Sequence, residues 1–291
     1  MRKILAAALT LALSGLATAA ARPAAEAPAA PHVAISRAEA LSAGRKIWVN
    51  ECGGTVPGLT HWNKGEAFAS LGIGHFIWYP ADERGPFVES FPELLAFLRA
   101  RRAPIPKWLL TARHCPWKNR AEFLKDSDSP RMKSLRAFLA GTVDLQALFL
   151  AERLEKALPL MLQSLPPARR GPVLAQFERV AQSPSGIYPL MDYVNFKGEG
   201  TALSERYKGR GWGLLQVLEE MKGSGSGPQT LREFSRAADF VLERRVRNSP
   251  HPKHDAAWLP IWRRRVAGYA DYRTLKYFPY GVQYRPGPPG R

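Results

Sequence analysis

The chain has only two cysteines, few acidic residues, and no long apolar run after its first 17 residues. Two cysteines permit a single intramolecular disulfide. No later stretch reaches about 18 uninterrupted apolar residues, so the sequence predicts no transmembrane segment. Zinc-finger spacing, an RNP-like aromatic strand and a phosphate-binding loop are all missing, which argues against nucleic acid as a partner.

The first 21 residues have the pattern of a secretory signal peptide. Arg2 and Lys3 precede an apolar run that is too short to span a bilayer comfortably, and Ala17-Thr18-Ala19 matches an A-x-A cleavage site. We therefore expect a soluble periplasmic or secreted protein. Residues 22–35 are rich in Ala and Pro and predict a flexible segment, and residues 277–291 form a Pro/Gly-rich tail.

Basic residues greatly outnumber acidic ones. The 42 Lys and Arg against 25 Asp and Glu give a formal net charge of +17, of which +15 remains once Arg2 and Lys3 leave with the signal peptide. Such a surface attracts polyanions. For an exported protein we expect these to be peptidoglycan and anionic envelope polymers, with no nucleic acid. We expect a monomer that needs no cofactor and no metal.

Export also bears on the two cysteines. An oxidising compartment favours a disulfide between Cys52 and Cys115, which in the chain-entropy model contributes roughly 4 kcal/mol. The bridge would hold the chain after Glu51 against residues 113–117. The alternative is a pair of buried free thiols.

The spacing of apolar residues predicts a mostly α (α+β) domain over residues 36–276. Ser36 and Glu39 have capping-box spacing, so we expect the first helix to begin there and to end at Glu51. Between Gly53 and Pro80, turn residues alternate with aromatic and apolar ones and predict a short irregular β-hairpin. Further helical spacing occurs in residues 91–98, 131–139, 144–162, 172–181, 214–221, 231–246 and 259–272.

Glu51 is the clearest candidate for a catalytic residue. It follows the apolar residues Ile47, Trp48 and Val49, and a carboxyl that loses hydration there disfavours its charged form. A protonated carboxyl can donate its proton to a leaving-group oxygen. The alternative is that Glu51 only caps the helix or forms a salt bridge at its end.

The segment Asn50-Glu51, together with Ser70-Leu71-Gly72-Ile73-Gly74-His75, resembles the beginning of the active-site lobe of phage-type lysozymes. Residues 192–200 and 211–217 resemble the second lobe of the same fold. Residues 213–217 are also similar to a turn of lytic transglycosylases, and residues 258–266 look like the basic closing helix. A kinked core helix followed by a glycine turn is the alternative for residues 192–217.

The resemblance implies a lysozyme-like, two-lobed helical domain with a small β-hairpin beside the cleft. It implies cleavage of the β-1,4 glycosidic bond of peptidoglycan, with Glu51 as the general acid. Asn195 and Glu199 are the candidates for the far side of the cleft. We expect Trp62 and His75 to contribute to the substrate-binding region, with His75 bracing the glycine turn through a backbone or carboxylate partner.

The sequence departs from the phage-type pattern at the residues that hold the attacking water. That family has an Asp shortly after the Glu and a Thr just before the glycine turn. Here residues 55–70 contain no Asp, Lys64 takes its place, and Ser70 takes the place of the Thr. Glu66 is the best remaining base.

Three functions therefore stay open at this point. Glu66 at about 6.5–9.5 Å from Glu51 would indicate an inverting hydrolase. Glu51 acting alone would indicate lytic transglycosylase chemistry, in which a hydroxyl of the sugar replaces water. A cleft without either arrangement would belong to a non-catalytic glycan-binding envelope protein.

Other motifs carry weaker signals. His61 is expected in an exposed loop. His251, His254 and Asp255 have no third spaced ligand nearby, so we expect no metal site there. Residues 223–227 contain Gly-x-Ser-x-Gly, but no predicted strand precedes them and their composition is that of a linker.

Overall fold

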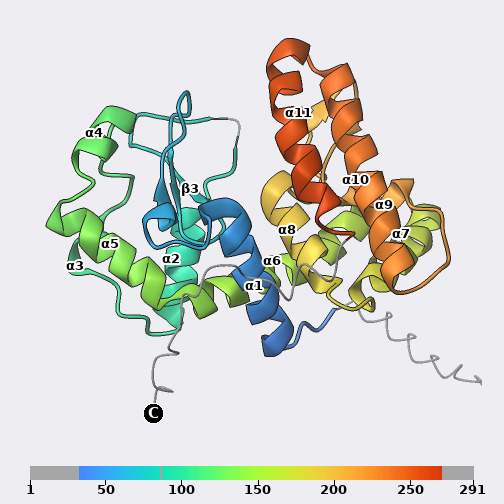
Figure 1. Cartoon of the computed structure of the whole chain (residues 1–291), viewed down its shortest axis with the longest axis horizontal. Helices are drawn as coiled ribbons and strands as arrows, with labels where there is room; N and C mark the ends of the chain where they lie inside the picture. Colours follow the sequence, from blue (N-terminus) through green and yellow to red (C-terminus); the bar gives the residue numbers. More distant parts are fainter. Residues whose placement is uncertain (1–32, 86, 271–291) are drawn as a thin grey trace, which may run out of the picture. The chain divides into compact units, whose positions relative to one another are not determined.

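The computed structural model describes residues 33–85 and 87–270, which form a mostly helical structure with small β elements (Figure 1). All of these residues belong to one unit of the chain, Pro31–Arg291. The predicted signal peptide and the Pro/Gly-rich tail lie outside the described residues. Residues 22–32 of the Ala/Pro-rich segment also lie outside them.

Helix α1 (Arg37–Cys52) has the predicted capping box. The Ser36 Oγ accepts a hydrogen bond from the Glu39 amide at 3.2 Å, and the Glu39 carboxylate accepts one from the Ser36 amide at 3.0 Å. The helix ends at Gly53, whose φ of +61° is the left-handed conformation that glycine adopts readily. Glu51 therefore lies in the last turn of α1, as the sequence predicted.

A three-stranded antiparallel sheet follows where a hairpin was predicted. It consists of β1 (Thr60–His61), β2 (Ala69–Leu71) and β3 (Phe76–Trp78) in the order β1-β2-β3. Ser70 in the middle strand pairs with His61 on one side and Ile77 on the other. Cross-strand partners share a sheet face, so these three side chains project from the same side.

The remaining elements include seven predicted helices and three that the sequence analysis did not define. The elements are η1 (Pro57–Leu59), α2 (Phe91–Ala100), α3 (Lys107–Thr111), α4 (Arg120–Lys125), α5 (Pro130–Gly141), α6 (Val143–Gln163), α7 (Pro167–Ala181), α8 (Ile187–Lys197), β4 (Arg206–Tyr207), β5 (Arg210–Gly211), α9 (Leu214–Glu220), α10 (Pro228–Asn248) and α11 (Pro252–Ala267). Helices α3 and α4 have 5 and 6 residues, too few to display a helical period. Helix α8 is apolar on nearly every side, which obscures its period.

Helix α1 packs against α6 and α8, and α10 packs against α11 (Figure 1). Gly44 permits the first of these contacts, because a Cβ at this position would overlap the side chain of Ala147 in α6. Ile47 and Leu154 are completely buried in the hydrophobic core that these helices share. This packing fixes the direction of α1 and hence the position of Glu51 at its end.

Replacing Gly44 with alanine is expected to lower the free energy of unfolding by about 1–3 kcal/mol, because the added methyl group forces α1 away from α6. Gly171→Ala is the matched control. No atom lies within 4 Å of a Cβ at Gly171 in α7, so alanine should stabilise the helix by roughly 0.4–1 kcal/mol. Urea unfolding of both variants checks the pair, and equal effects of the two changes would contradict the close approach.

Among the described residues, no single helix is long and apolar enough to cross a membrane. Helices α5 and α6 satisfy the length and composition criteria only together, and they are bent by 66° at the break between them. Leu135 of α5 and Leu154 of α6 are both fully buried in the core.

Candidate functional site

The Glu51 carboxylate is held by side chains from three other parts of the chain. Arg265 of α11 donates from Nη2 to Oε1 at 2.6 Å, and Asn195 of α8 donates to the same oxygen at 3.4 Å. His75 Nδ1 lies 3.6 Å from Oε2. No described residue forms a hydrogen bond to Oε2. Oε1 thus accepts two hydrogen bonds, whereas Oε2 accepts none from a described residue and can carry a proton.

Arg265 also binds a second, fully buried carboxylate. Its Nε and Nη2 donate to the two oxygens of Asp192, each at 2.8 Å, and the Tyr269 hydroxyl donates to Asp192 Oδ2. Although burial opposes the charge, Asp192 and Glu51 raise the pKa of Arg265 well above its usual range. Burial, followed by the charge of Asp192, raises the pKa of Tyr269. Arg265 is therefore a permanent cation shared by two carboxylates.

The end of α1 is tied to α8 by further contacts. Asn50 Nδ2 donates to the Tyr188 hydroxyl at 2.5 Å. Tyr188 in turn meets Tyr269 edge to face, with ring centres 5.7 Å apart. Asn195 Nδ2 also donates to the Gly74 carbonyl at 3.0 Å. Asn195 thereby connects Glu51 directly to the glycine turn.

His75 makes the bracing contact expected from the sequence. Its Nε2 lies 3.3 Å from the Gly58 carbonyl, and its φ is +49° in the turn before β3. Burial lowers the pKa of His75, although the charge of Glu51 opposes this shift. The imidazole is therefore neutral at neutral pH, and His61, which is exposed as expected, stacks on it at 5.7 Å.

Glu66 and Ser70 lie near this group without contacting Glu51. Asn63 Nδ2 donates to Glu66 Oε2 at 2.9 Å, and Asn63 Oδ1 is 2.9 Å from His61 Nε2. Burial raises the pKa of Glu66, while Asn63 opposes the shift. Ser70 is buried in β2 opposite His61. None of the described hydrogen bonds or ion pairs of Glu51 involves Glu66 or Ser70.

Trp62 does not lie where the sequence analysis placed it. Its side chain is 2% exposed and packs against Phe123, with ring centres 5.7 Å apart. Its indole N–H donates to the Glu66 carbonyl at 2.7 Å. Trp62 is a core residue that shapes the loop before β2, so its ring offers no face to a sugar.

A cavity of about 460 Å³ lies next to two residues that contact Glu51, although Glu51 itself is not among the residues that line it. Its lining includes the predicted residues His75, Asn195 and Glu199, and both His75 and Asn195 contact Glu51. Ile77, which shares a sheet face with Ser70, lines it as well. Its volume falls in the range of small-ligand sites.

The predicted disulfide is not formed in the structure. Cys52 and Cys115 are both buried free thiols. The Cys52 thiol donates to the Gly72 carbonyl at 3.3 Å, whereas the backbone amide of Cys115 donates to the Tyr79 carbonyl at 2.9 Å. Burial raises the pKa of Cys52, and it raises that of Cys115 to about 12, so both remain protonated at neutral pH.

Residues 33–85 and 87–270 contain no group of three or more His, Cys, Asp or Glu side chains with the spacing of a metal site. His254 Nδ1 lies 3.3 Å from Asp255 Oδ1, but no third such side chain joins them in this part of the chain.

Several site residues were missed by sequence reasoning. Asp192 is a lone acidic residue in the apolar run 187–194, and that isolation was the signal for a buried polar network. Arg265 is the last of three consecutive arginines, so the local sequence does not indicate which of the three reaches the site. Glu205 lines the cavity, and burial followed by the charge of Glu199 raises its pKa.

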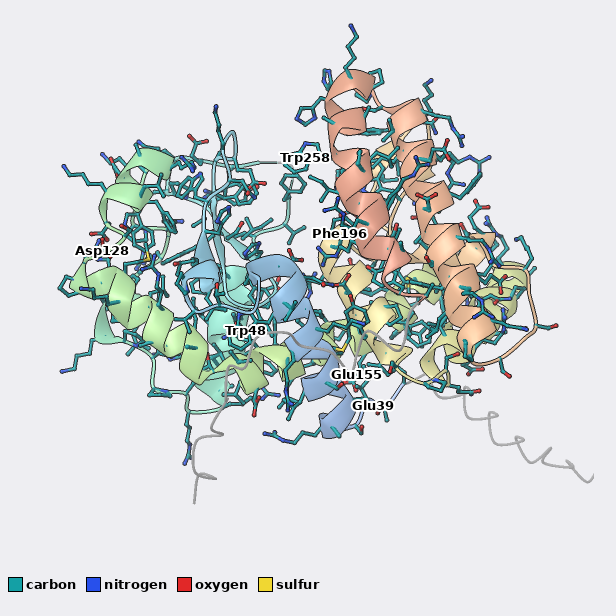
Figure 2. The ribbon with its side chains drawn as sticks, in the orientation of Figure 1. Glu39, Trp48, Asp128, Glu155, Phe196 and Trp258 are labelled. Carbon is teal, nitrogen blue, oxygen red and sulfur yellow. The ribbon has the colours of Figure 1, made fainter. Side chains whose placement is uncertain are left out.

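Cationic and aromatic side chains alternate between Glu51 and the cavity. The Arg265 guanidinium lies 4.2 Å from the Phe196 ring, and Figure 2 shows Phe196 beside α11. Lys197 Nζ lies 4.0 Å from the Phe196 ring and 3.7 Å from the Trp262 ring. Arg245 follows at 4.9 Å from the Trp262 ring. Aromatic faces thus hold three cations close together.

Lys197→Met is expected to raise the free energy of unfolding by about 1 kcal/mol or more near neutral pH. Burial, aided by Arg245 and Arg265, lowers the pKa of Lys197 well below its usual value. The unfolded chain therefore binds more protons between that lowered value and about pH 10.5, and stability of the wild type rises with pH across this window. Thermal unfolding at pH 7 and pH 10 measures the gain, which should shrink at the higher pH.

Lys253→Met provides the control, because Lys253 is exposed at the start of α11. It should change stability by no more than about 0.5 kcal/mol at either pH. A lower melting temperature of Lys197→Met at both pH values would show that the cation–aromatic contacts outweigh the cost of burying the amine.

Comparison with known proteins found no relative of this chain. No protein-family model matches the chain, and no curated protein and no solved structure matches it. We therefore infer the function from the residues and geometry of the site itself.

Proposed function

We propose that this protein cleaves the β-1,4 glycosidic bonds of peptidoglycan glycan strands, with Glu51 as the general acid, on a lysozyme-like two-lobed fold. The observation that carries the proposal is the asymmetric setting of the Glu51 carboxylate. Arg265 and Asn195 anchor Oε1, while Oε2 has no hydrogen bond from a described residue and is free to hold a proton. His75 and Asn195 contact Glu51 and also line the cavity, which supplies room for sugar.

The charges around Glu51 are compatible with a proton-donating form. Asp192 takes two hydrogen bonds from Arg265, so one cation serves two carboxylates. The group of Asp192, Arg265 and Glu51 has no net charge when Glu51 holds a proton, and a net charge of −1 when it does not. Protonated Glu51 therefore leaves no buried charge unbalanced.

The route after proton donation has two forms. In hydrolysis a water attacks the sugar, and Glu66 is the proposed base, with Asn63, His61 and His75 lying between it and Glu51. In the lytic transglycosylase form, Glu51 acts alone and a hydroxyl of the sugar attacks.

The charge of the chain supports an anionic polymer as the substrate. With a net charge of +15 after loss of the proposed signal peptide, the protein would associate with peptidoglycan and envelope polymers in the periplasm or outside the cell. This association should weaken as salt is added, because screening shortens the reach of surface charges.

Mass spectrometry of the soluble products tests the proposal. The purified protein is incubated with isolated peptidoglycan, and released fragments are separated and weighed. Muropeptides with reducing ends support a hydrolase, and anhydro ends support a transglycosylase. Retained binding without any released fragment would contradict cleavage and leave a non-catalytic glycan-binding protein.

A further inference from the structure

The cavity that His75 and Asn195 line contains basic and acidic groups that form no ion pair with one another. Lys197 and Arg245 line it with basic groups, and Glu199 and Glu205 line it with carboxyl groups. Within the described part of the chain, no ion pair joins either cation to either carboxylate; the one ion pair of Arg245 is with Asp255. Opposite charges kept apart in one cavity are available to a ligand.

Aromatic rings flank both cations of the cavity. Arg245 lies 4.3 Å from the Trp212 ring, and its Nε is buried without a hydrogen-bond acceptor. That Nε faces Asp255 Oδ2 at 3.7 Å, beyond hydrogen-bond distance, and Asp255 Oδ2 has no other hydrogen bond. No carboxylate of a described residue lies within 4 Å of Lys197 Nζ. A bound carboxylate would give Lys197 a counter-charge and would share the charge of Arg245 with Asp255.

The two carboxylates are brought together by the glycine-containing loop after α8. Gly198 has a φ of +76°, and a Cβ there would come within 2.9 Å of Glu205 Oε1. The Glu205 carboxyl consequently lies against the loop backbone near Glu199. Burial, followed by the charge of Glu199, raises the pKa of Glu205. A bound ammonium group would relieve the repulsion between the two carboxylates.

We infer that this cavity binds a zwitterionic group, with Lys197 and Arg245 taking its carboxylate and Glu199 and Glu205 taking its ammonium. The inference rests on the proposed function, because it assigns the zwitterion to the peptide stem of the glycan, at an end that has both a free amine and a free carboxyl. A ligand with one charge would satisfy only one side of the cavity. The volume of about 460 Å³ accommodates an amino-acid-sized group.

Titration calorimetry with three forms of one muropeptide tests the inference. The first form has a free side-chain amine and a free carboxyl, the second is N-acetylated at that amine, and the third is amidated at that carboxyl. We expect each block to weaken binding to the wild type about tenfold or more, the effect of losing one charge-assisted hydrogen bond. Equal binding of all three forms would overturn the inference.

Two variants assign the two charges. Lys197→Met should bind the free and amidated forms equally while still preferring the free amine. Glu199→Gln should show the reverse pattern. Lys253→Met removes one exposed charge and should keep both preferences. If this control loses either preference, the preference arises from the net positive charge of the protein and not from the cavity, and the inference is overturned. Thermal unfolding confirms that each variant is folded.

Failure of this inference is distinguishable from failure of the proposed function. Glycan strands stripped of their peptides test cleavage without a zwitterion. If the wild type cleaves these strands but binds the three muropeptides equally, the proposed function stands and the zwitterion site is wrong. If nothing is cleaved but the preferences and their variants behave as expected, the binding site stands without the glycosidase.

Discussion

Glu51→Gln is expected to lower the rate of glycan cleavage by at least about 10²- to 10⁴-fold, the usual contribution of a general acid. This substitution should preserve the hydrogen bonds that hold the side chain. A glutamine oxygen in the place of Oε1 still accepts the hydrogen bonds of Arg265 and Asn195, and the amide replaces Oε2, which has no hydrogen bond from a described residue. The loss of rate would therefore report the missing proton.

The measurement is initial release of soluble fragments from peptidoglycan under saturating enzyme, together with a melting temperature. Glu83→Gln is the matched control, since Glu83 is exposed in the turn after β3 and should retain the wild-type rate. Glu66→Gln separates the two routes, because a comparable loss supports Glu66 as the base and a near-normal rate supports Glu51 acting alone. A fully active Glu51→Gln would remove Glu51 from the chemistry.

Asp192→Ala is expected to lower the free energy of unfolding by about 3–5 kcal/mol, because it leaves the buried Arg265 guanidinium with one carboxylate instead of two and leaves the Tyr269 hydroxyl without its acceptor. For a protein of this size the melting temperature should fall by roughly 6–20 °C. Differential scanning calorimetry provides the measurement.

Asp239→Ala is the matched control for this loss. Asp239 also accepts a hydrogen bond from an arginine of α11, Arg263, at 2.7 Å, but that pair is 39–46% exposed. Its removal should cost no more than about 1 kcal/mol, because solvent screens the charges. Equal losses from the two aspartates would contradict the importance of the buried network.

Asp192→Asn tests the charge separately from the shape. The amide retains much of the side chain's volume but removes the carboxylate that competes with Glu51 for Arg265. Arg265 and Tyr269 then keep a hydrogen-bond acceptor at position 192, so the loss of stability should be smaller than that of Asp192→Ala. Calorimetry of both variants measures the difference. Equal losses would mean that the charge of Asp192, and not its shape, stabilises the network.

Much of the fold near Glu51 was predictable because it depends on local chemistry. The capping box at Ser36 and Glu39 begins α1, and the left-handed Gly53 ends it after Glu51. The glycine turn before His75 was also predictable from the sequence, because Gly72 has a φ of +72°, which few other residues adopt. Helices with a long apolar period, such as α6 (Val143–Gln163), were located within a residue or two.

The arrangement around Glu51 was less predictable because it depends on contacts between distant segments. Arg265 is 214 residues from Glu51, and three consecutive arginines give no local indication of which one turns inward. Glu66 has suitable chemistry, but the path of its loop is set by Trp62 burying itself against Phe123. The disulfide prediction used compartment alone, whereas Cys52 and Cys115 are both buried free thiols in the structure.

The central claim is that a glycan strand occupies the cavity with its scissile bond at Glu51. A crystal structure of Glu51→Gln soaked with a peptidoglycan-derived tetrasaccharide tests it most directly. The account predicts sugar rings in the cavity beside His75 and Asn195, with a glycosidic oxygen about 2.6–3.2 Å from the side chain at position 51. A tetrasaccharide bound elsewhere on the surface, with the cavity unoccupied by sugar, would contradict it.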